Sequence, residues 1–286
     1  EAAVLVPILE DAAFEGSERF SLSLETPAGV FDSAFTGAFG TATIADNEVS
    51  GSEGDDVLIG TIASQAMSGR GGNDEMQGRG GNDTMYGGDG TDTLNGGTGD
   101  DRIYGGGSEN DRRDVIYGGE GNDTIDGGYG NDELRGDAGD DVIAGGFGGD
   151  TVIGGTGDDT LTGSALGDEI YGGDGMDFVN GGFGHDRVNG GAGADEFFHL
   201  GIFDHGSDWI QDYAAAEGDV LVFGGSATID QFQVNTTETA GAGAAGADEA
   251  FVIYRPTGQI MWALIDGAGE DSIMLSLGGE LYDLVA

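Results

Sequence analysis

The chain has 286 residues, with 61 glycines, 3 prolines, no cysteine, and 54 acidic against 9 basic residues, which gives a net charge of −45. This charge excludes nucleic acid as an expected partner, disfavours anionic membrane surfaces, and predicts strong self-repulsion unless cations bind. The sequence has no run of about eighteen apolar residues to span a membrane, and without cysteine its stability does not come from disulfides.

The first 49 residues are predicted to form antiparallel strands. Alternating stretches at 4–9, 19–24 and 40–44 are separated by turn-rich segments. The segment PILEDAAFEGSERFSLSLETPAG, followed by GTATIADNE, resembles the second half of a Calx-beta domain, a β-sandwich module of bacterial surface proteins. That resemblance implies a partial sandwich over 1–49 that another segment or chain completes, with Asp46 and Glu48 as candidate calcium ligands. A solvated acidic linker is the alternative interpretation.

A nine-residue repeat begins at Gly51 and continues to Phe198. Between 118 and 162 it reads GGEGNDTID, GGYGNDELR, GDAGDDVIA, GGFGGDTVI and GGTGDDTLT, with Asp at the sixth position and an apolar residue at the eighth. Sixteen units account for the span if one of them, 105–117, carries four extra residues. The eighth positions are Leu58, Met67, Met76, Met85, Leu94, Ile103, Ile116, Ile125, Leu134, Ile143, Val152, Leu161, Ile170, Val179, Val188 and Phe197.

The physical chemistry of the repeat predicts a stack that requires cations. Glycines at the first, second and fourth positions permit tight turns, and the last three residues of each unit are expected to form a short strand. If each unit makes half a coil, residues eighteen apart lie above one another, so that Asp123 lies over Asp141. Two carboxylates at about 4 Å repel by roughly 4 kcal/mol at an effective dielectric of 20. Carboxylate and carbonyl oxygens without thiols favour Ca²⁺ over zinc or copper.

The nonapeptide G-G-x-G-x-D-x-U-x resembles the calcium-binding repeat of RTX proteins. That resemblance implies a parallel β-roll in which turn carbonyls and the Asp side chains of units n and n+2 share one ion. The implied calcium ligands are Asp56, Asp74, Asp83, Asp92, Asp101, Asp114, Asp123, Asp132, Asp141, Asp150, Asp159, Asp168, Asp177, Asp186 and Asp195. Gln65 replaces the Asp in one unit, so we expect defective sites around that turn.

Two units depart from the pattern. The insertion in 105–117 is expected to bulge from a turn, and it carries Arg112 and Arg113, with Arg102 close by. These arginines either contact an acidic partner or pair with nearby Asp, and the second interpretation is favoured. The unit 163–171 has Leu166 where the pattern has glycine.

The remaining segment, 199–286, is predicted to close the roll. The stretch DEFFHLGIFDHGSDWIQDYAAAEGDVLVFGG resembles the segment that ends RTX rolls, and Asp208 and Asp212 are candidate ligands of a last ion. Strands expected at 231–234, 250–255, 259–265 and 272–277 indicate a small β-sandwich cap, because a repeat array needs its open end covered. The ending, 271–286, resembles the uncleaved signal of type I secreted proteins. No leader is recognisable before Glu1, so we expect the chain to be part of a longer protein or a processed product.

Motifs of known enzymes are missing from this sequence. It has no H-E-x-x-H, no Gly-Lys-Ser/Thr loop and no G-x-S-x-G. His185, His199 and His205 are scattered and are expected to be solvated or hydrogen-bonded, and Trp209 and Trp262 are expected in the cap core. We therefore expect a non-enzymatic protein.

The expected fold is all-β: a partial Calx-beta sandwich (1–49), a calcium-binding parallel β-roll (50–198) and a β-sandwich-like cap with a type I secretion signal (199–286). The expected function is that of an extracellular or cell-surface module, part of an adhesin, S-layer or extracellular fibre, which folds on binding several Ca²⁺ ions. Expected partners are calcium, other copies of itself, surface proteins or glycans, and the type I secretion machinery. The alternative is the C-terminal folding module of an RTX protease, lipase or epimerase.

Overall fold

The computed structural model describes residues 48–202 and 205–286. The partial Calx-beta domain was predicted for residues 1–49. Residues 1–47 of it, and with them the candidate ligand Asp46, lie outside the described residues. Glu48, the other candidate ligand there, begins the first strand of the roll. No helix in the described part is long and apolar enough to cross a membrane.

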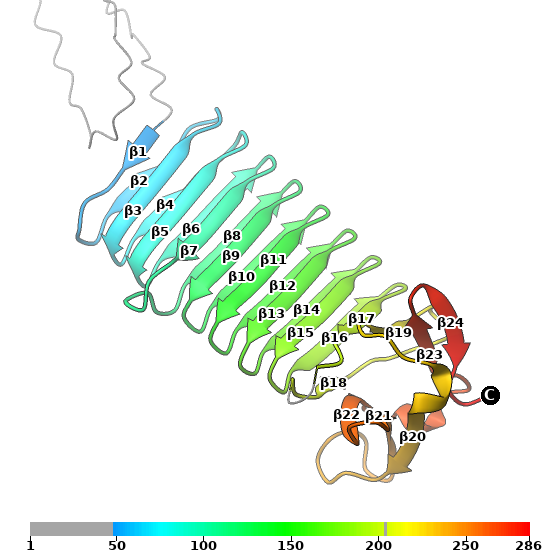
Figure 1. Cartoon of the computed structure of the whole chain (residues 1–286). Coiled ribbons are helices and arrows are strands. Elements are labelled where there is room, and N and C mark those ends of the chain that lie inside the picture. Colours follow the sequence, from blue (N-terminus) through cyan, green and yellow to red (C-terminus); the bar gives the residue numbers. More distant parts are fainter. Residues whose placement is uncertain (1–47, 203–204) are drawn as a thin grey trace, which may run out of the picture.

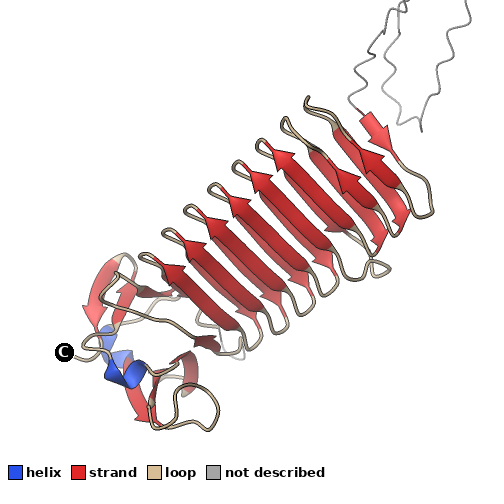
Figure 2. Ribbon diagram, turned by 180° about the vertical axis from the view of Figure 1, so that it is seen from behind, coloured by secondary structure: helices blue, strands red, loops and turns tan. Residues whose placement is uncertain are grey.

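The chain winds into a parallel β-solenoid with two twelve-stranded sheets (Figures 1 and 2). One sheet contains, in spatial order, β1 (Glu48–Ser50), β3 (Ala66–Gly72), β5 (Thr84–Gly90), β7 (Arg102–Gly106), β9 (Thr124–Tyr129), β11 (Val142–Phe147), β13 (Thr160–Ala165), β15 (Phe178–Phe183), β17 (Glu196–His199), β19 (Val220–Phe223), β23 (Met274–Leu277) and β24 (Glu280–Asp283). The other contains β2 (Val57–Ile59), β4 (Glu75–Gln77), β6 (Thr93–Thr98), β8 (Val115–Glu120), β10 (Glu133–Ala138), β12 (Thr151–Thr156), β14 (Glu169–Asp174), β16 (Arg187–Ala192), β18 (Asp208–Ile210), β22 (Gln259–Leu264), β21 (Glu249–Tyr254) and β20 (Phe232–Thr237). The all-β prediction with a parallel roll is confirmed.

Each nonapeptide forms half a coil, as predicted, so that units eighteen residues apart become neighbours in one sheet. In the pairing of β9 with β11, Ile125 faces Ile143 and Gly128 faces Gly146. The strands are longer than the three residues predicted, because most also include the first three residues of the next unit. Glycines at those positions permit the neighbouring backbones to approach closely and continue the sheet.

The interior of the roll is a single file of the eighth-position side chains. From Met67 to Phe197 all of them are buried, with at most 3% of their surface exposed, whereas Leu58 in the first coil is only partly covered. The alternation of strand residues places their neighbours on the outer surface. The predicted core is thus confirmed, and among the described residues its first fully buried side chain is Met67.

Tight turns need left-handed backbone at the second and fourth positions of the repeat. Gly148, a fourth-position residue, has φ of 150°, and a Cβ there would lie 1.5 Å from the carbonyl oxygen of Gly130. Leu166, the predicted departure, nevertheless keeps the fourth-position geometry with φ of 85°. Arg70 and Arg79, at second positions, have φ of 78°. Such non-glycine residues cost about 1 to 3 kcal/mol each, so the stacking of the coils dictates the turn even where the residue disfavours it.

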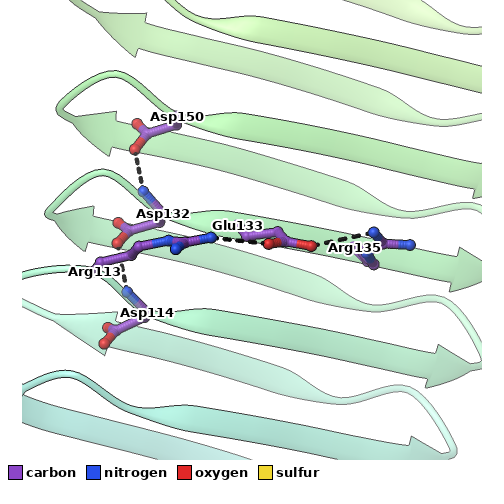
Figure 3. A network of polar contacts seen from close by, with 6 residues as sticks. All are labelled: Arg113, Asp114, Asp132, Glu133, Arg135 and Asp150. Atoms are coloured by element: carbon purple, nitrogen blue, oxygen red, sulfur yellow. Dashed lines mark hydrogen bonds and ion pairs between the residues drawn. The ribbon is translucent and has the colours of Figure 1, made fainter.

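The insertion leaves the stack intact. It lies between β7 and β8 and loops out from a turn (Figure 1), while β6 pairs with β8 and β7 with β9 in the regular register. Arg113 forms an ion pair with Glu133 (3.0 Å), to which Arg135 also binds (3.1 Å; Figure 3). The prediction that a loop arginine pairs with a nearby acidic side chain is therefore right, although the partner is a Glu on the outer face of β10.

The segment after the repeats extends both sheets and then turns back on itself. β18 and β22 continue one sheet in parallel and β19 and β23 the other, after which β21, β20 and β24 pair antiparallel. Two short 3₁₀ helices, η1 (Ile229–Gln231) and η2 (Gly267–Gly269), lie between these strands. Trp262 is fully buried here as predicted, whereas Trp209 is half-buried and packs edge-to-face on Phe251. The cap thus covers the last coil, and its buried side chains continue the apolar cluster of the roll.

Candidate metal centres

The sixth-position Asp side chains form two stacks, one along each row of turns. The backbone N–H of each Asp donates to Oδ1 of the Asp in the next coil, as from Asp123 to Asp141 at 2.7 Å and from Asp132 to Asp150 at 2.7 Å (Figure 3). One stack runs through Asp56, Asp74, Asp92, Asp114, Asp132, Asp150, Asp168 and Asp186. The other runs through Gln65, Asp83, Asp101, Asp123, Asp141, Asp159, Asp177 and Asp195.

The second oxygen of these carboxylates is buried without a hydrogen-bond partner. The residues from Asp74 to Asp195 at the sixth position are at most 3% exposed. Their unpartnered buried oxygens are Oδ2 of Asp74, Asp83, Asp92, Asp101, Asp114, Asp123, Asp132, Asp141, Asp150, Asp159, Asp168, Asp177 and Asp186. A buried carboxylate without a partner costs several kcal/mol, and a cation removes that cost. The repetition at every coil indicates a row of ion sites.

Burial is the main reason why the pKa values of these carboxyl groups lie above the ordinary range. It raises the pKa of Asp114 and Asp132 to about 8, against an ordinary value of 3.8, with the charges of neighbouring Asp residues adding to the effect. The pKa rises to about 7 for Asp123, Asp141 and Asp168. It rises to about 6 for Asp92, Asp101, Asp150, Asp159, Asp177 and Asp195. Ion binding to those groups that still hold a proton near neutral pH is therefore coupled to proton release.

The first coil of the roll differs from the coils in its middle. Asp56 in the first coil is partly exposed, and hydrogen bonds from Ser52 lower its pKa. At Gln65 the backbone ladder continues through its N–H to Asp83 (2.7 Å), while its side chain accepts from the N–H of Thr61. At this turn a carboxylate is missing, but the backbone ladder is intact. That calcium binding is defective there stays a prediction.

The two candidate ligands after the repeats lie in different surroundings. Asp208 is buried beside Asp186, has an unpartnered Oδ1, and its pKa is raised well above the ordinary value by burial and by Asp186. Its carboxylate accepts the N–H of Asp186 and so extends that Asp stack, while its role as a calcium ligand stays a prediction. Asp212 instead accepts the N–H groups of Gly190 (3.0 Å) and Gly191 (2.7 Å), so both its oxygens are occupied.

Asp219 takes the next place in the second stack and was missed by the sequence analysis. Its Oδ1 accepts the N–H of Asp195 (3.1 Å) and its Oδ2 that of Ala214 (2.8 Å). Its spacing of 24 residues from Asp195 falls outside the period, so no repeat count could identify it. The Gly-Asp dipeptide before β19 is the signal that was available.

The histidines do not form a site with these stacks. His199 and His205 are buried between the roll and the cap, where the N–H of Gly201 donates to Nδ1 of His199 (2.9 Å). Burial lowers the pKa of His199 to about 4. His185 is bound to Ser207 at the surface. The prediction of solvated or hydrogen-bonded histidines is confirmed for His185 and His199, whereas Nδ1 of His205 is buried without a hydrogen-bond partner.

The donor set fits a hard divalent cation. Across residues 48–202 and 205–286, no three acidic or histidine side chains gather into one metal-binding group. Each ion would therefore take main-chain carbonyl oxygens in addition to the stacked carboxylates. An all-oxygen set of this kind is what Ca²⁺ prefers, with 6 to 8 ligands in a flexible arrangement. The residues that would hold the ions are thus the two Asp stacks.

Replacing Asp141 by Asn tests one link of this row. The amide keeps an oxygen for the N–H of Asp123 but removes the carboxylate charge, so the fold is retained and the calcium ligand is lost. We expect roughly a tenfold rise in the calcium concentration at half-folding, because ion affinity follows the ligand charge count. Asp126→Asn, an exposed residue on the same sheet, is the matched control. Equal midpoints for both variants would contradict the assignment of Asp141.

Comparison with known protein families identifies the repeat. The family described as the RTX calcium-binding nonapeptide repeat (4 copies) matches residues 41–62, 66–94, 86–111, 108–143, 144–165 and 162–197. These segments cover 41–62 and 66–197, which is more than half of the 286 residues. The comparison with curated proteins gives no match. The matched segments contain fifteen of the sixteen sixth-position residues, all but Gln65, and leave the cap uncovered.

Proposed function

Since the chain belongs to the family of RTX calcium-binding nonapeptide repeats, we propose that it is an extracellular structural module whose roll folds only when calcium binds. The repeats bind calcium ions at multiple sites. The observation that carries the proposal is the row of buried Asp Oδ2 atoms without hydrogen-bond partners. Such a row opposes folding of the metal-free chain and favours folding of the calcium-loaded one.

The switch follows from coupling between ion binding and folding. Where free calcium is scarce, as in a cytosol, a chain with a net charge of −45 stays expanded, because the self-repulsion of its charges opposes collapse. Outside the cell, calcium near the millimolar range fills sites with dissociation constants of about 10⁻⁴ to 10⁻³ M. The ions neutralise the stacked carboxylates, and the two sheets form around the apolar file.

The role is proposed to be mechanical and not enzymatic. Carboxylates that repeat identically along the roll suit a ladder of ions, whereas a catalytic site requires one distinct constellation. We place the module in an adhesin, S-layer or extracellular fibre, as a spacer made rigid by calcium. We propose export through a type I system because residues 271–286 resemble the uncleaved signal of type I secreted proteins.

A calcium titration tests the proposed function. Starting from chelator-stripped protein at pH 7.5, we expect the circular dichroism signal of β-structure to appear cooperatively, with a midpoint between about 10⁻⁴ and 10⁻³ M. Magnesium at the same concentrations is the control and should leave the signal unchanged, because Mg²⁺ demands a smaller octahedral site and gives up water reluctantly. A full sheet signal before any calcium is added would refute the proposal.

A further inference from the structure

The four-residue insertion brings a carboxylate to a place where no other unit has one. Asp111 lies in this loop yet is only 6% exposed, and its Oδ2 is buried without a hydrogen-bond partner. A Cβ on Gly106 would lie 2.3 Å from this oxygen and 2.1 Å from the carbonyl oxygen of Gly88. At the corresponding Gly97, the atoms nearest to an added Cβ would be backbone atoms of Arg79. The insertion thus adds an anionic oxygen beside a turn carbonyl.

The loop is held in this position from the coil before it. The hydroxyl of Ser108 donates to Oδ1 of Asp89 (2.5 Å), and the side-chain amide of Asn110 donates to Oδ2 of Asp89 (3.1 Å). The backbone N–H of Asp111 donates to the carbonyl of Ser108 (3.1 Å), and Oδ1 of Asp111 accepts the N–H of Arg112 (2.9 Å). These bonds leave Oδ2 of Asp111 facing the turn.

Asp111 is a neighbour of the regular stack ligand Asp114. The two carboxyl groups are within hydrogen-bonding reach, and the charge of Asp111 is one cause of the raised pKa of Asp114. Oδ2 of Asp114 is also unpartnered and lies beside Gly105, the residue before Gly106. Two unsatisfied carboxylate oxygens from one unit therefore lie along two consecutive glycines. Elsewhere in the described roll a unit supplies at most one such oxygen.

We propose that Asp111 and Asp114 together bind one Ca²⁺ ion, which makes the turn of residues 105–114 the tightest calcium site of the roll. The proposal rests on the proposed function and deepens it. A second carboxylate adds a negative charge to the ligand set, and calcium affinity rises with that charge count. On this account the insertion provides the second carboxylate of a tight site, and its Arg113 separately pairs with Glu133.

Calcium titration of the full chain against a competing chelator tests the assignment, with Asp111→Asn as the variant and Glu109→Gln as its control. Glu109 is in the same loop and is exposed, so its replacement removes the same charge without touching the turn. We expect the unaltered chain to bind one equivalent at least about tenfold more tightly than the rest. Asp111→Asn should lose that tight equivalent, and Glu109→Gln should keep it.

The outcomes separate the two proposals. If the unaltered chain binds calcium and Asp111→Asn shows the same isotherm, the tight site is refuted and the proposed function stands. If the unaltered chain binds no calcium, both fail. Asp111→Ala is a second variant that removes both oxygens without adding bulk, and it must lose the same equivalent. Circular dichroism at saturating calcium verifies that each variant folds, and the loss of one equivalent from a folded variant supports the proposal.

Discussion

Chelation of calcium at pH 7.5 is expected to abolish backbone protection throughout residues 66–199, as measured by amide hydrogen exchange. Neighbouring strands in a sheet lie about 4.8 Å apart, and two unit charges at that distance repel by roughly 3 to 4 kcal/mol at an effective dielectric of 20. The described chain stacks such carboxylates in successive coils, with thirteen sixth-position Oδ2 atoms that have no partner. One small apolar side chain per half coil, contributing about 1.5 to 3 kcal/mol, does not offset this repulsion.

The amides to follow are those of the Asp stacks, since each donates to the carboxylate of the next coil, as Asp123 does to Asp141. With calcium they should exchange slowly, and after chelation within seconds. Readdition of calcium is the control, because it should restore the protection and so exclude irreversible damage. A chelated sample that retained slow exchange at Asp123 and its neighbours would show that apolar packing alone holds the roll.

Lowering the pH from 8 to 5.5 is expected to restore sheet structure to the metal-free chain. The carboxyl groups of the stacks have pKa values of about 6 to 8 in the folded roll, as for Asp150 and Asp132, and 3.8 is their ordinary value. The folded state therefore binds more protons than the unfolded state between pH 4 and 8. By linkage, the free energy of unfolding then falls as the pH rises through this window, so acid stabilises the metal-free roll.

Calcium affinity has the opposite dependence on pH. The ion binds the deprotonated carboxylates and releases protons, so the calcium concentration needed for folding should rise as the pH falls. The measurement is circular dichroism of chelated and calcium-loaded samples at each pH. Their signals should differ most near pH 8 and converge near pH 5.5. A metal-free chain that remained unfolded at pH 5.5 would contradict the raised pKa values and the burial that causes them.

The repeating part of this molecule was predicted well from its sequence. The eighth-position residues from Met67 to Phe197 were expected in the core and are buried there. The sixth-position Asp residues were expected to stack in steps of two units, and Asp123 and Asp141 do so. Both predictions depended only on the period, because each nonapeptide packs against equivalent neighbours in the stack.

The non-repeating parts were predicted less well. Asp219, which extends the second stack, and Asp111, which lies beside Asp114, were missed, because each is positioned by a segment of irregular length. Asp212 was expected to be a calcium ligand, which stays a prediction, and its carboxylate accepts the N–H groups of Gly190 and Gly191. The cap strands were expected at about the right residues, whereas their pairing order, with β22 and β23 continuing the two sheets of the roll, was not predicted.

The sequence by itself determined the coil, its apolar file and the two rows of carboxylates, because a strict period converts local spacing into position along the roll. Only the tertiary structure decided which carboxylate oxygens lack a partner, and that the inserted loop turns Asp111 inward beside Asp114. Those outcomes depend on hydrogen bonds between residues of different coils, such as Ser108 with Asp89. No spacing along the chain specifies such contacts, since they form only after the coils have stacked.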